Sequence, residues 1–391
     1  MYVDEIKTHT KIKPLKYSAR ETPHITIEPN RTCNIRCRLC YTRNKNFVKS
    51  LNDVKQEVDI AVKKRKIETI TLLGGEPTLH PNIIEIIRYI KSKRVRSQLL
   101  TNGILLLEDK NERFLDALID AGIDRILLHI DIGQKHVHGD IEGVRDKLFS
   151  ILERKKVHFS LSLTIYEENL GEISGCLLRY SHYKFFDGIL AVLARDPFHQ
   201  YDNNPELIQE YEDIFYSLKL EPSAYIPSSL DDKYLSWLIY FYFINTKNRM
   251  IFGVSPVVDR ILRKLHRAVK GHQLFSPVIP QQQLYFFLFL IGILEILIHP
   301  PKIRSFYRLA SNSGLKGGIR FHFIAIQTPP EFNQKKNHYQ ICYSCPDATI
   351  RNGKLTPVCI ADKINPIING DKNVEIRDDL YHDVYLHLEK I

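Results

Sequence analysis

The sequence contains no run of about 20 apolar residues, the length that a helix needs to cross a bilayer. Its longest apolar run, Leu284 to Ile298, has fifteen residues and includes Glu295. The first residues, MYVDEIKTHTKIK, are charged and lack the apolar segment of a secretory signal. Seven cysteines would be an unusual disulfide scaffold for 391 residues, and they suit metal-bound thiolates in a reducing compartment better. We therefore expect a cytoplasmic protein without membrane-spanning helices.

The composition sets broad limits. With 391 residues and 44% hydrophobic content, the chain can form one large domain and a smaller one. A net charge of +10 is compatible with an acidic partner such as nucleic acid, anionic lipid or a phosphorylated substrate. Charge alone does not choose among these partners.

Three cysteines stand close together in the stretch RTCNIRCRLCY, which follows a strand-like run. Cys33, Cys37 and Cys40 have C-x3-C-x2-C spacing, and Tyr41 comes directly after them. Three thiolates this close can bind three irons of a 4Fe-4S cube and leave the fourth iron open. Structural zinc and ordinary buried cysteines are the alternatives. Zinc prefers four ligands, and neither a histidine nor a fourth cysteine lies near the triplet in the sequence.

A second motif, Gly74-Gly75-Glu76-Pro77, follows the apolar run Thr69 to Leu73. Two glycines allow the backbone to approach a ligand closely, and the glutamate supplies an anion for an ammonium group. The motif alone is a weak signal. Behind the cysteine triplet, in this order, it is a strong one.

In this order, the cysteine triplet with its trailing tyrosine and the GGEP motif resemble the radical S-adenosylmethionine (radical SAM) superfamily. The resemblance implies that Cys33, Cys37 and Cys40 bind a catalytic 4Fe-4S cluster, whose open iron is chelated by the methionyl group of S-adenosylmethionine. It implies that Tyr41 lies against the adenine and that residues 74–77 bind the methionyl amine. One electron, delivered by a reductant protein such as flavodoxin or ferredoxin, then yields a 5'-deoxyadenosyl radical that abstracts hydrogen from the substrate.

From His24 to about Arg195, short β-rich runs alternate with helical patterns, which is typical of a parallel α/β fold. Six strands and their connecting helices predict a partial (β/α)6 TIM barrel, the fold that the resemblance also implies. The expected strands are residues 24–29, 69–73, 96–101, 125–131, 157–165 and 187–194, and the expected helices are residues 51–66, 81–93, 110–121, 140–155 and 171–180. The expected parts are an N-terminal extension (1–20), the barrel (21–200), an inserted helical segment rich in apolar and basic residues (201–318) and a small cluster-binding C-terminal extension (319–391).

Residues that directly follow the strands matter most, because ligands of such barrels lie at the carboxyl ends of the strands. Asn102 follows the third expected strand, and Asp131 ends the fourth. The resemblance implies that both regions line the pocket for the S-adenosylmethionine ribose and the substrate. Asn102-Gly103 is equally well explained as a plain turn, whereas an acid that ends an apolar strand is poorly explained by packing. The nearby His129 is better explained as an ordinary histidine than as part of a second metal site.

The middle segment has a different pattern. It contains the apolar blocks Leu235 to Ile244 and Leu284 to Ile298, with a basic amphipathic helix at Ser255 to Lys270 between them. The second block is explained as a core helix of the inserted segment. Alternatively, with the basic helix and the cluster around Arg304 and Arg308, it docks on an anionic membrane surface or lines a slot for an acyl or isoprenoid chain.

A second cysteine constellation, Cys342, Cys345 and Cys359, has C-x2-C-x13-C spacing. The step Asn352-Gly353 predicts a hairpin that brings Cys359 toward the pair. The arrangement is similar to the twitch or SPASM extensions of the superfamily, and its spacing equals that of the auxiliary cluster in the GTP cyclase of molybdenum-cofactor biosynthesis. The resemblance implies a second, substrate-facing iron-sulfur cluster.

Two qualifications apply to this second constellation. A zinc ribbon with His338 or Asp362 as the fourth ligand remains the alternative to a cluster. Pro346-Asp347-Ala348 stand where the cyclase carries arginines, which argues against GTP as the substrate.

We therefore predict a radical SAM oxidoreductase or transferase. Its predicted substrate is a small molecule of the lipid or isoprenoid class, reached through peripheral membrane contact, because the middle segment combines aromatic residues with a basic helix. A peptide-modifying maturase is the first alternative, although the first twenty residues are short for a leader-binding domain. A zinc-containing nucleic-acid-binding protein is the alternative of another class, but it does not explain why the two motifs occur in catalytic order.

Overall fold

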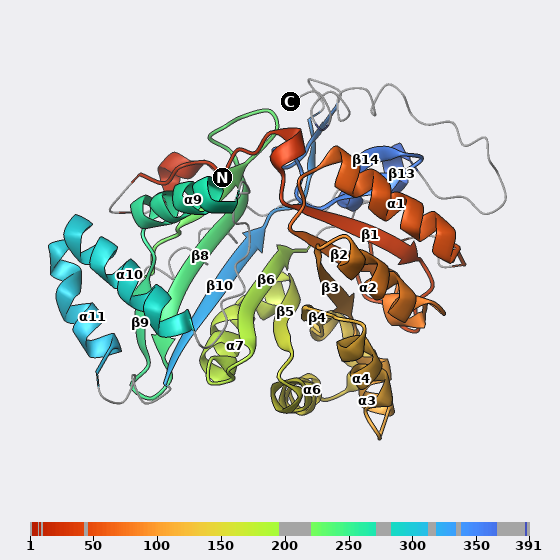
Figure 1. The fold of residues 1–391 in the computed structure, drawn as a ribbon, viewed down its shortest axis with the longest axis horizontal. Coiled ribbons are helices and arrows are strands. Elements are labelled where there is room, and N and C mark those ends of the chain that lie inside the picture. The colour runs from red at the N-terminus through yellow and green to blue at the C-terminus, as the bar shows by residue number, and fades with distance from the viewer. Residues whose placement is uncertain are drawn as a thin grey trace.

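The computed structural model describes residues 2–6, 8, 11–42, 46–194, 220–270, 283–311, 318–333, 338–365 and 388. Its centre is a sheet in which six strands stand side by side in sequence order and run parallel (Figure 1). These strands are β1 (His24–Asn30), β2 (Thr69–Gly74), β3 (Arg96–Thr101), β4 (Arg125–His129), β5 (His158–Ile165) and β6 (Phe186–Leu193). The predicted partial (β/α)6 barrel is confirmed.

The connecting helices cover one face of these strands, as alternation along each strand requires. In β1, Ile25 and Ile27 belong to the same hydrophobic core as Val54 and Val58 of α1, whereas Thr26 faces the other side and lines a cavity. The helices of this region are α1 (Leu51–Lys64), α2 (Ile83–Ser92), α3 (Ile104–Glu108), α4 (Arg113–Asp120), α5 (Lys135–His138), α6 (Ile141–Lys155) and α7 (Glu172–Tyr180).

The sheet continues beyond β6 and does not close into a barrel. Strand β10 (Ile319–Gln327) pairs with β6 in parallel, and β8 (Leu235–Asn245) pairs antiparallel with β10. Two short strands, β7 (Ala224–Pro227) and β9 (Met250–Gly253), pair with β8. The edges of the sheet path are therefore β1 and β7.

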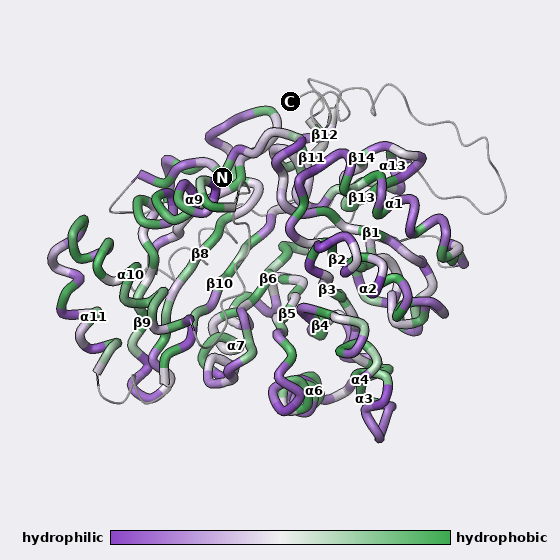
Figure 2. Tube along the Cα trace, viewed as in Figure 1, coloured by the Kyte–Doolittle hydropathy of each residue, from purple (hydrophilic) through white to green (hydrophobic). Residues whose placement is uncertain are grey.

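The prediction that residues 201–318 are helical is wrong for β7, β8 and β9. All eleven residues of β8 are buried, because the strand is covered on both faces. A strand covered on both faces lacks alternation, and its apolar run cannot be told from a buried helix by periodicity. Helices do follow, at α9 (Pro256–Lys270), α10 (Leu284–Ile298) and α11 (Ile303–Leu309), and the trace of α10 is mostly hydrophobic (Figure 2).

None of the helices in the described ranges is long and apolar enough to cross a membrane. Helix α9 lies against the amino ends of the barrel strands, since His266 Nε2 is 3.4 Å from Glu68 Oε1, directly before β2. The C-terminal helix expected at residues 377–390 lies outside the described residues, apart from Leu388. The 3-10 helices are Val3–Glu5, Ala19–Glu21, Pro77–Leu79, Ile132–Gln134, Glu167–Asn169, Pro300–Lys302 and Val358–Ile360.

The C-terminal part packs on the β1 edge of the sheet. The predicted hairpin is present, with Asn352 and Gly353 at positive φ between β13 (Ala348–Arg351) and β14 (Lys354–Pro357). Thr26 Oγ1 of β1 donates a hydrogen bond to the carbonyl of Ala348 (3.1 Å). The remaining elements are the paired β11 (Glu331–Asn333) and β12 (His338–Gln340), and the short helix α13 (Ala361–Ile364).

The segment just before this hairpin joins the two edges of the sheet. On the β7 side, Tyr343 N–H donates to the carbonyl of Pro227 (2.8 Å). On the β1 side, a ring nitrogen of His24 lies 2.9 Å from the carbonyl oxygen of Pro346. Residues 343–346 therefore span the opening that the unclosed sheet leaves between β7 and β1.

Candidate functional site

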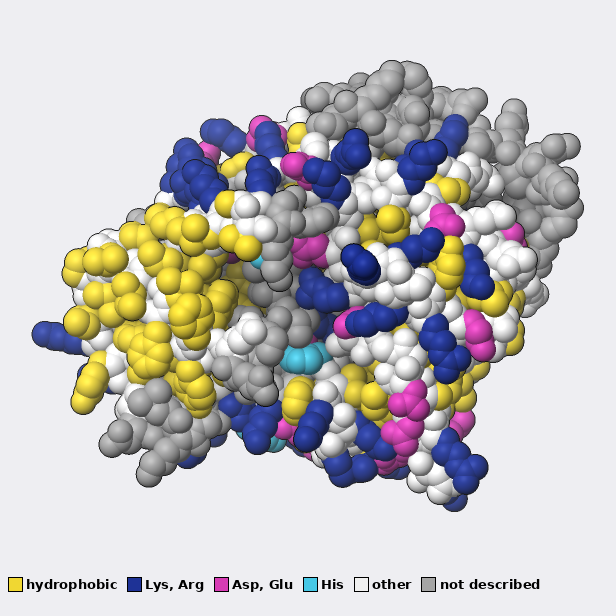
Figure 3. Space-filling model, in the orientation of Figure 1, with side chains coloured by type: hydrophobic (Ala, Val, Ile, Leu, Met, Phe, Trp, Pro, Cys, Tyr) yellow, Lys and Arg dark blue, Asp and Glu magenta, His cyan; other side chains and the backbone are white. Residues whose placement is uncertain are grey.

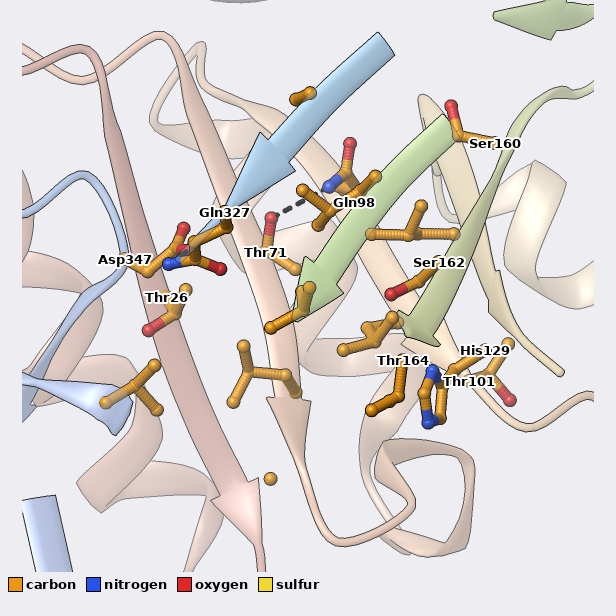
Figure 4. A pocket seen from close by; sticks show the side chains of 18 of the residues that line it. Thr26, Thr71, Gln98, Thr101, His129, Ser160, Ser162, Thr164, Gln327 and Asp347 are labelled. Atoms are coloured by element: carbon orange, nitrogen blue, oxygen red, sulfur yellow. Dashed lines mark hydrogen bonds between the residues drawn. The ribbon is translucent and has the colours of Figure 1, made fainter. Parts of the chain in front are cut away.

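A cavity of about 280 Å³ lies on the inner side of the partial barrel. Polar side chains from the inner positions of the strands, among them Thr71, Gln98 and Ser162, point into it (Figure 4). One hydrogen bond, from Gln98 Nε2 to Thr71 Oγ1 (3.0 Å), crosses its wall. The carboxyl end of the cavity is lined by most of the residues selected from the sequence: Cys33, Cys37, Cys40, Tyr41, Gly74, Gly75, Glu76 and Asn102. Pro77 and Asp131 are not among the lining residues.

The three cysteines lie on the irregular loop after β1, half-buried and without disulfide bonds. In the part of the chain that the structure describes, no three His, Cys, Asp or Glu side chains converge on one metal-ion position. A single zinc ion needs such convergence. A 4Fe-4S cube does not, because each thiolate binds a different iron. The donor set therefore fits the cluster better than zinc.

Cys37 lies in surroundings that favour its thiolate. Gln134 Nε2 lies 3.6 Å from its sulfur as a donor. Burial alone would raise the pKa of Cys37, but the hydrogen bond and positive charge of His129 outweigh it and lower the pKa. Because the thiolate is the form that binds iron, these neighbours suit a ligand.

His129 is a site residue that the sequence analysis set aside. It ends β4, lines the cavity, and its Nε2 lies 3.7 Å from Asp131 Oδ2. Burial would lower its pKa, but Asp131 and Cys37 raise the pKa to about 9. Its position at a strand end, two residues before an acid, was the available signal. Only the fold places Cys37 beside it.

The two glycines of the GGEP motif allow the chain to approach itself. Gly74 has φ +136°, and a Cβ there would lie 2.2 Å from the carbonyl oxygen of Asn30. A Cβ on Gly75 would lie 2.2 Å from the carbonyl oxygen of Thr32. Tyr41 donates a hydrogen bond from its hydroxyl to the carbonyl of Gly74 (3.4 Å). The motif therefore packs directly against both ends of the cysteine loop.

Glu76 joins two loops at the carboxyl end of the sheet. Its carboxylate accepts hydrogen bonds from the hydroxyls of Thr78 (2.6 Å) and Thr101 (2.7 Å) and from the Asn102 N–H (2.8 Å). Burial raises the pKa of Glu76 despite these donors. Asn102 in turn donates from Nδ2 to Asn34 Oδ1 in the cysteine loop (2.8 Å). Asn102 thus does more than form a turn, because it connects β3 to that loop.

Asp131 is buried but serves the backbone. It accepts hydrogen bonds from the N–H groups of Gly133 (2.8 Å) and Thr164 (2.7 Å). These bonds hold the ends of β4 and β5 together and satisfy an acid that packing alone left unexplained. The carboxylate acts on the cavity through His129.

The second set of cysteines lies behind the cavity wall. Cys342, Cys345 and Cys359 are all buried. Burial raises the pKa of Cys342 to about 12, with the nearby Cys359 adding to the rise. Trp237 lines the cavity and donates a hydrogen bond from Nε1 to the sulfur of Cys342 (3.2 Å). The indole therefore stands between the cavity and this second sulfur cluster.

A zinc ribbon finds little support at this second site. Asp362, one of the two fourth ligands considered, is held by Arg31 and Arg351. The side chain of His338, the other, is not described. As at the first site, the sulfurs in the described ranges do not converge on one ion position.

Comparison with known proteins identifies the barrel region. The family model described as the Radical SAM superfamily matches residues 27–173. The chain is 29% identical over 168 residues to a probable GTP 3',8-cyclase of Methanocaldococcus jannaschii, which covers 39% of this chain and 54% of the relative. It is 32% identical over 144 residues to a probable GTP 3',8-cyclase of Methanococcus maripaludis, which covers 33% of this chain and 44% of the relative. The chain thus spans about half the length of the curated relatives it matches.

Among solved structures, similarity is more distant. SuiB of Streptococcus suis bound to S-adenosylmethionine has a TM-score of 0.40 and 14% identity, covering 52% of this chain and 49% of SuiB. The enzyme anSMEcpe with bound AdoMet has a TM-score of 0.39 and 15% identity, covering 65% of this chain and 68% of that chain. Both TM-scores are too low to support a functional conclusion.

Proposed function

Residues 27–173 make this chain a member of the radical SAM superfamily, and we propose that it is an enzyme that cleaves S-adenosylmethionine reductively and uses the resulting radical on a substrate in the barrel cavity. One observation carries the proposal. The cysteine triplet, Tyr41 and the GGEP loop, which are far apart in the sequence, line the same end of one cavity. A reductant protein such as flavodoxin or ferredoxin would supply the electron.

In this proposal Cys33, Cys37 and Cys40 hold three irons of a 4Fe-4S cluster, and the GGEP loop and Tyr41 bind S-adenosylmethionine beside it. When bound there, the cluster supplies the electron that the cleavage needs. Glu76 faces the cavity and fixes its loop to Asn102, so that the two loops form one rigid wall of the site. Pro77 begins the 3-10 helix that follows this wall.

The inner wall contributes by excluding water and stray hydrogen donors from a radical. Apolar side chains line the cavity away from the cysteine loop, on the strands β3, β4, β6, β8 and β10. They are Leu100, Leu127, Leu190, Val192, Ile239, Phe241, Phe323 and Ala325. Asn102 and His129 lie between this region and the cysteines.

We further propose that Cys342, Cys345 and Cys359 hold a second iron-sulfur cluster. The three thiols lie within interaction range of one another, since each of the others raises the pKa of Cys345 further above what burial gives. Trp237 would form a direct contact between this cluster and a substrate in the cavity. Its hydrogen bond to Cys342 favours the thiolate form.

The cavity favours an apolar or amphiphilic substrate such as a lipid or isoprenoid. Two arginines line it, but Arg96 is paired with Glu68 (3.3 Å) and Arg125 with Asp187 (2.8 Å). Asp347 adds a carboxylate to the wall. A triphosphate would therefore meet cations that are already neutralised, and an acid.

GTP is the second candidate, because the curated relatives that match the barrel region are named GTP 3',8-cyclases. Those matches end within the first half of this chain's length and do not include the apolar wall of β8 and β10. The two substrates are therefore to be separated by experiment.

The test is 5'-deoxyadenosine release by the anaerobically reconstituted, reduced protein. Release that is lost in Cys40→Ala and kept in Cys176→Ala supports the radical SAM assignment, because Cys176 lies in α7, outside the cavity lining. Stimulation by a lipid extract of the same cells supports the lipid substrate. Stimulation by GTP and not by lipid supports the cyclase alternative, and no release under any condition contradicts the proposal.

A further inference from the structure

Helix α10 is apolar on two opposite faces, but only one of them packs against the protein. Leu284, Leu288 and Ile291 are buried against the sheet side. Residues spaced by three, four and four positions share one helix face, and such a row points outward from α10. Its members are Phe286, Phe289, Ile293 and Leu297, with exposed fractions of 76%, 42%, 55% and 73%. A helix at the surface of a globular protein normally carries polar residues there.

Helix α11 extends this outer face. Phe306 packs against α10, since a Cβ on Gly292 would lie 2.1 Å from its ring and its centroid is 5.9 Å from that of Phe289. Ile303 and Tyr307, one turn apart on α11, are 54% and 77% exposed. We call the six exposed side chains of the two helices the α10–α11 surface: Phe286, Phe289, Ile293, Leu297, Ile303 and Tyr307. Figure 3 shows hydrophobic side chains gathered over these two helices. A contiguous apolar patch of this kind marks an interaction site.

The charges around this surface have one sign. Glu295 is the acidic residue within residues 284–311, and it is fully buried, bound to Lys302 Nζ (2.7 Å) and to the Ser255 N–H. Arg304 and Arg308 are exposed on α11, and Lys264 is exposed on the neighbouring α9. The outer rim of the patch is therefore cationic.

We propose that the α10–α11 surface docks on an anionic lipid membrane. Aromatic and aliphatic side chains enter the boundary between headgroups and acyl chains, while Arg304 and Arg308 meet the lipid phosphates. Contact is peripheral, since neither helix is long enough to span a bilayer. This inference is independent of the proposed chemistry, because the surface lies outside the cavity lining.

A second copy of the chain is the competing occupant. A two-fold contact through this patch would bring the arginine pairs of both copies to the same interface. Like charges placed together at an interface oppose association. An anionic bilayer neutralises the same residues, so the charge pattern favours the membrane.

The test is flotation of the full chain with vesicles of phosphatidylcholine alone or of an equimolar mixture of phosphatidylcholine and phosphatidylglycerol. Binding is expected to the anionic vesicles at low salt and to weaken as salt is added. Arg304→Gln with Arg308→Gln should lower the partition coefficient about 30-fold, since each basic residue near the surface contributes about 1 kcal/mol. Ile293→Ser with Leu297→Ser should lower it by at least about tenfold.

Matched controls lie on distant helices. Arg88→Gln with Lys147→Gln removes the same charge from exposed positions of α2 and α6, and Leu178→Ser with Val62→Ser removes exposed apolar side chains from α7 and α1. These variants should bind like the original chain. Absence of binding at low salt, or equal losses in patch and control variants, overturns the proposal. So does a dimer in sedimentation that Ile293→Ser disrupts while vesicles are not bound.

Discussion

The guanidinium of Arg31 and the carboxylate of Asp362 form a two-pronged ion pair that connects the two cysteine sites. Arg31 Nη1 lies 2.8 Å from Asp362 Oδ1, and Nη2 contacts Oδ2. Arg351 binds the same carboxylate (2.7 Å) and also Glu28 in β1 (2.7 Å). Arg31 stands two residues before Cys33, and Asp362 three residues after Cys359. Two cations and two anions thus form a neutral, buried network between the cysteine loop and the C-terminal hairpin.

Removal of one partner from this network should be costly. Asp362→Ala leaves two buried guanidinium groups without their shared carboxylate, and we expect the free energy of unfolding to fall by about 3–5 kcal/mol. Urea denaturation measures this loss. Asp146→Ala is the control, because its pair with Arg179 is about 40% exposed and worth at most about 1 kcal/mol. Equal losses in the two variants would show that the network does not stabilise the fold.

The contact of Gly75 with the cysteine loop predicts a second effect. In Gly75→Ala the new methyl group meets the carbonyl oxygens of Thr32 and Arg31 at 2.2 and 2.4 Å. The backbone must move, and we expect a loss of about 1–3 kcal/mol in stability together with weaker retention of iron after reconstitution.

The matched control for that variant is Gly175→Ala. A Cβ on Gly175 meets nothing within 4 Å, and the residue lies within α7. Stability should rise by up to about 1 kcal/mol, with iron unchanged. Full iron retention in Gly75→Ala would show that the close approach is not needed for the loop.

His322 of β10 should make stability depend on pH. It is fully buried, with its ring 5.5 Å from Phe186 and 5.7 Å from Tyr242 between centroids. Burial lowers its pKa to about 4, whereas the unfolded chain binds this proton near pH 6.5. The contribution of the neutral ring is therefore complete above about pH 6.5. As pH falls from there to about 4, up to about 3 kcal/mol is lost.

His322→Phe keeps an aromatic ring and removes the proton-binding group. The slope of unfolding free energy against pH, measured by urea denaturation between about pH 4 and 6.5, should be shallower than in the original chain. Parallel curves for the two proteins would mean that His322 takes up its proton in the folded state as readily as in the unfolded one.

Iron counting separates the two cysteine sites. Replacement of Cys33, Cys37 and Cys40 by alanine should remove about four irons per chain, and so should replacement of Cys342, Cys345 and Cys359. Cys176→Ala removes a buried thiol near Arg145 and should leave the iron content unchanged. If the second triple variant retains all iron, the proposed second cluster is refuted, while the first site stays under its own test.

The sequence alone determined the features that depend on local spacing. The cysteine triplet and the GGEP motif are short patterns, the strands β1 to β6 show the alternation of a sheet with helices on one side, and Asn352-Gly353 specifies its own hairpin turn. These patterns predicted the barrel, the family and the residues at the carboxyl end of the cavity.

Tertiary structure decided what depends on partners distant in the chain. Strand β8 reads as a generic apolar run, because it is covered on both faces and has no period of its own. His129 gains its importance only where the fold places Cys37 beside it, and Asp131 turns to backbone donors of Thr164 rather than to the cavity. The outer face of α10 is apolar in either setting, and only the packing of its opposite face against the sheet leaves Ile293 and Leu297 in contact with solvent.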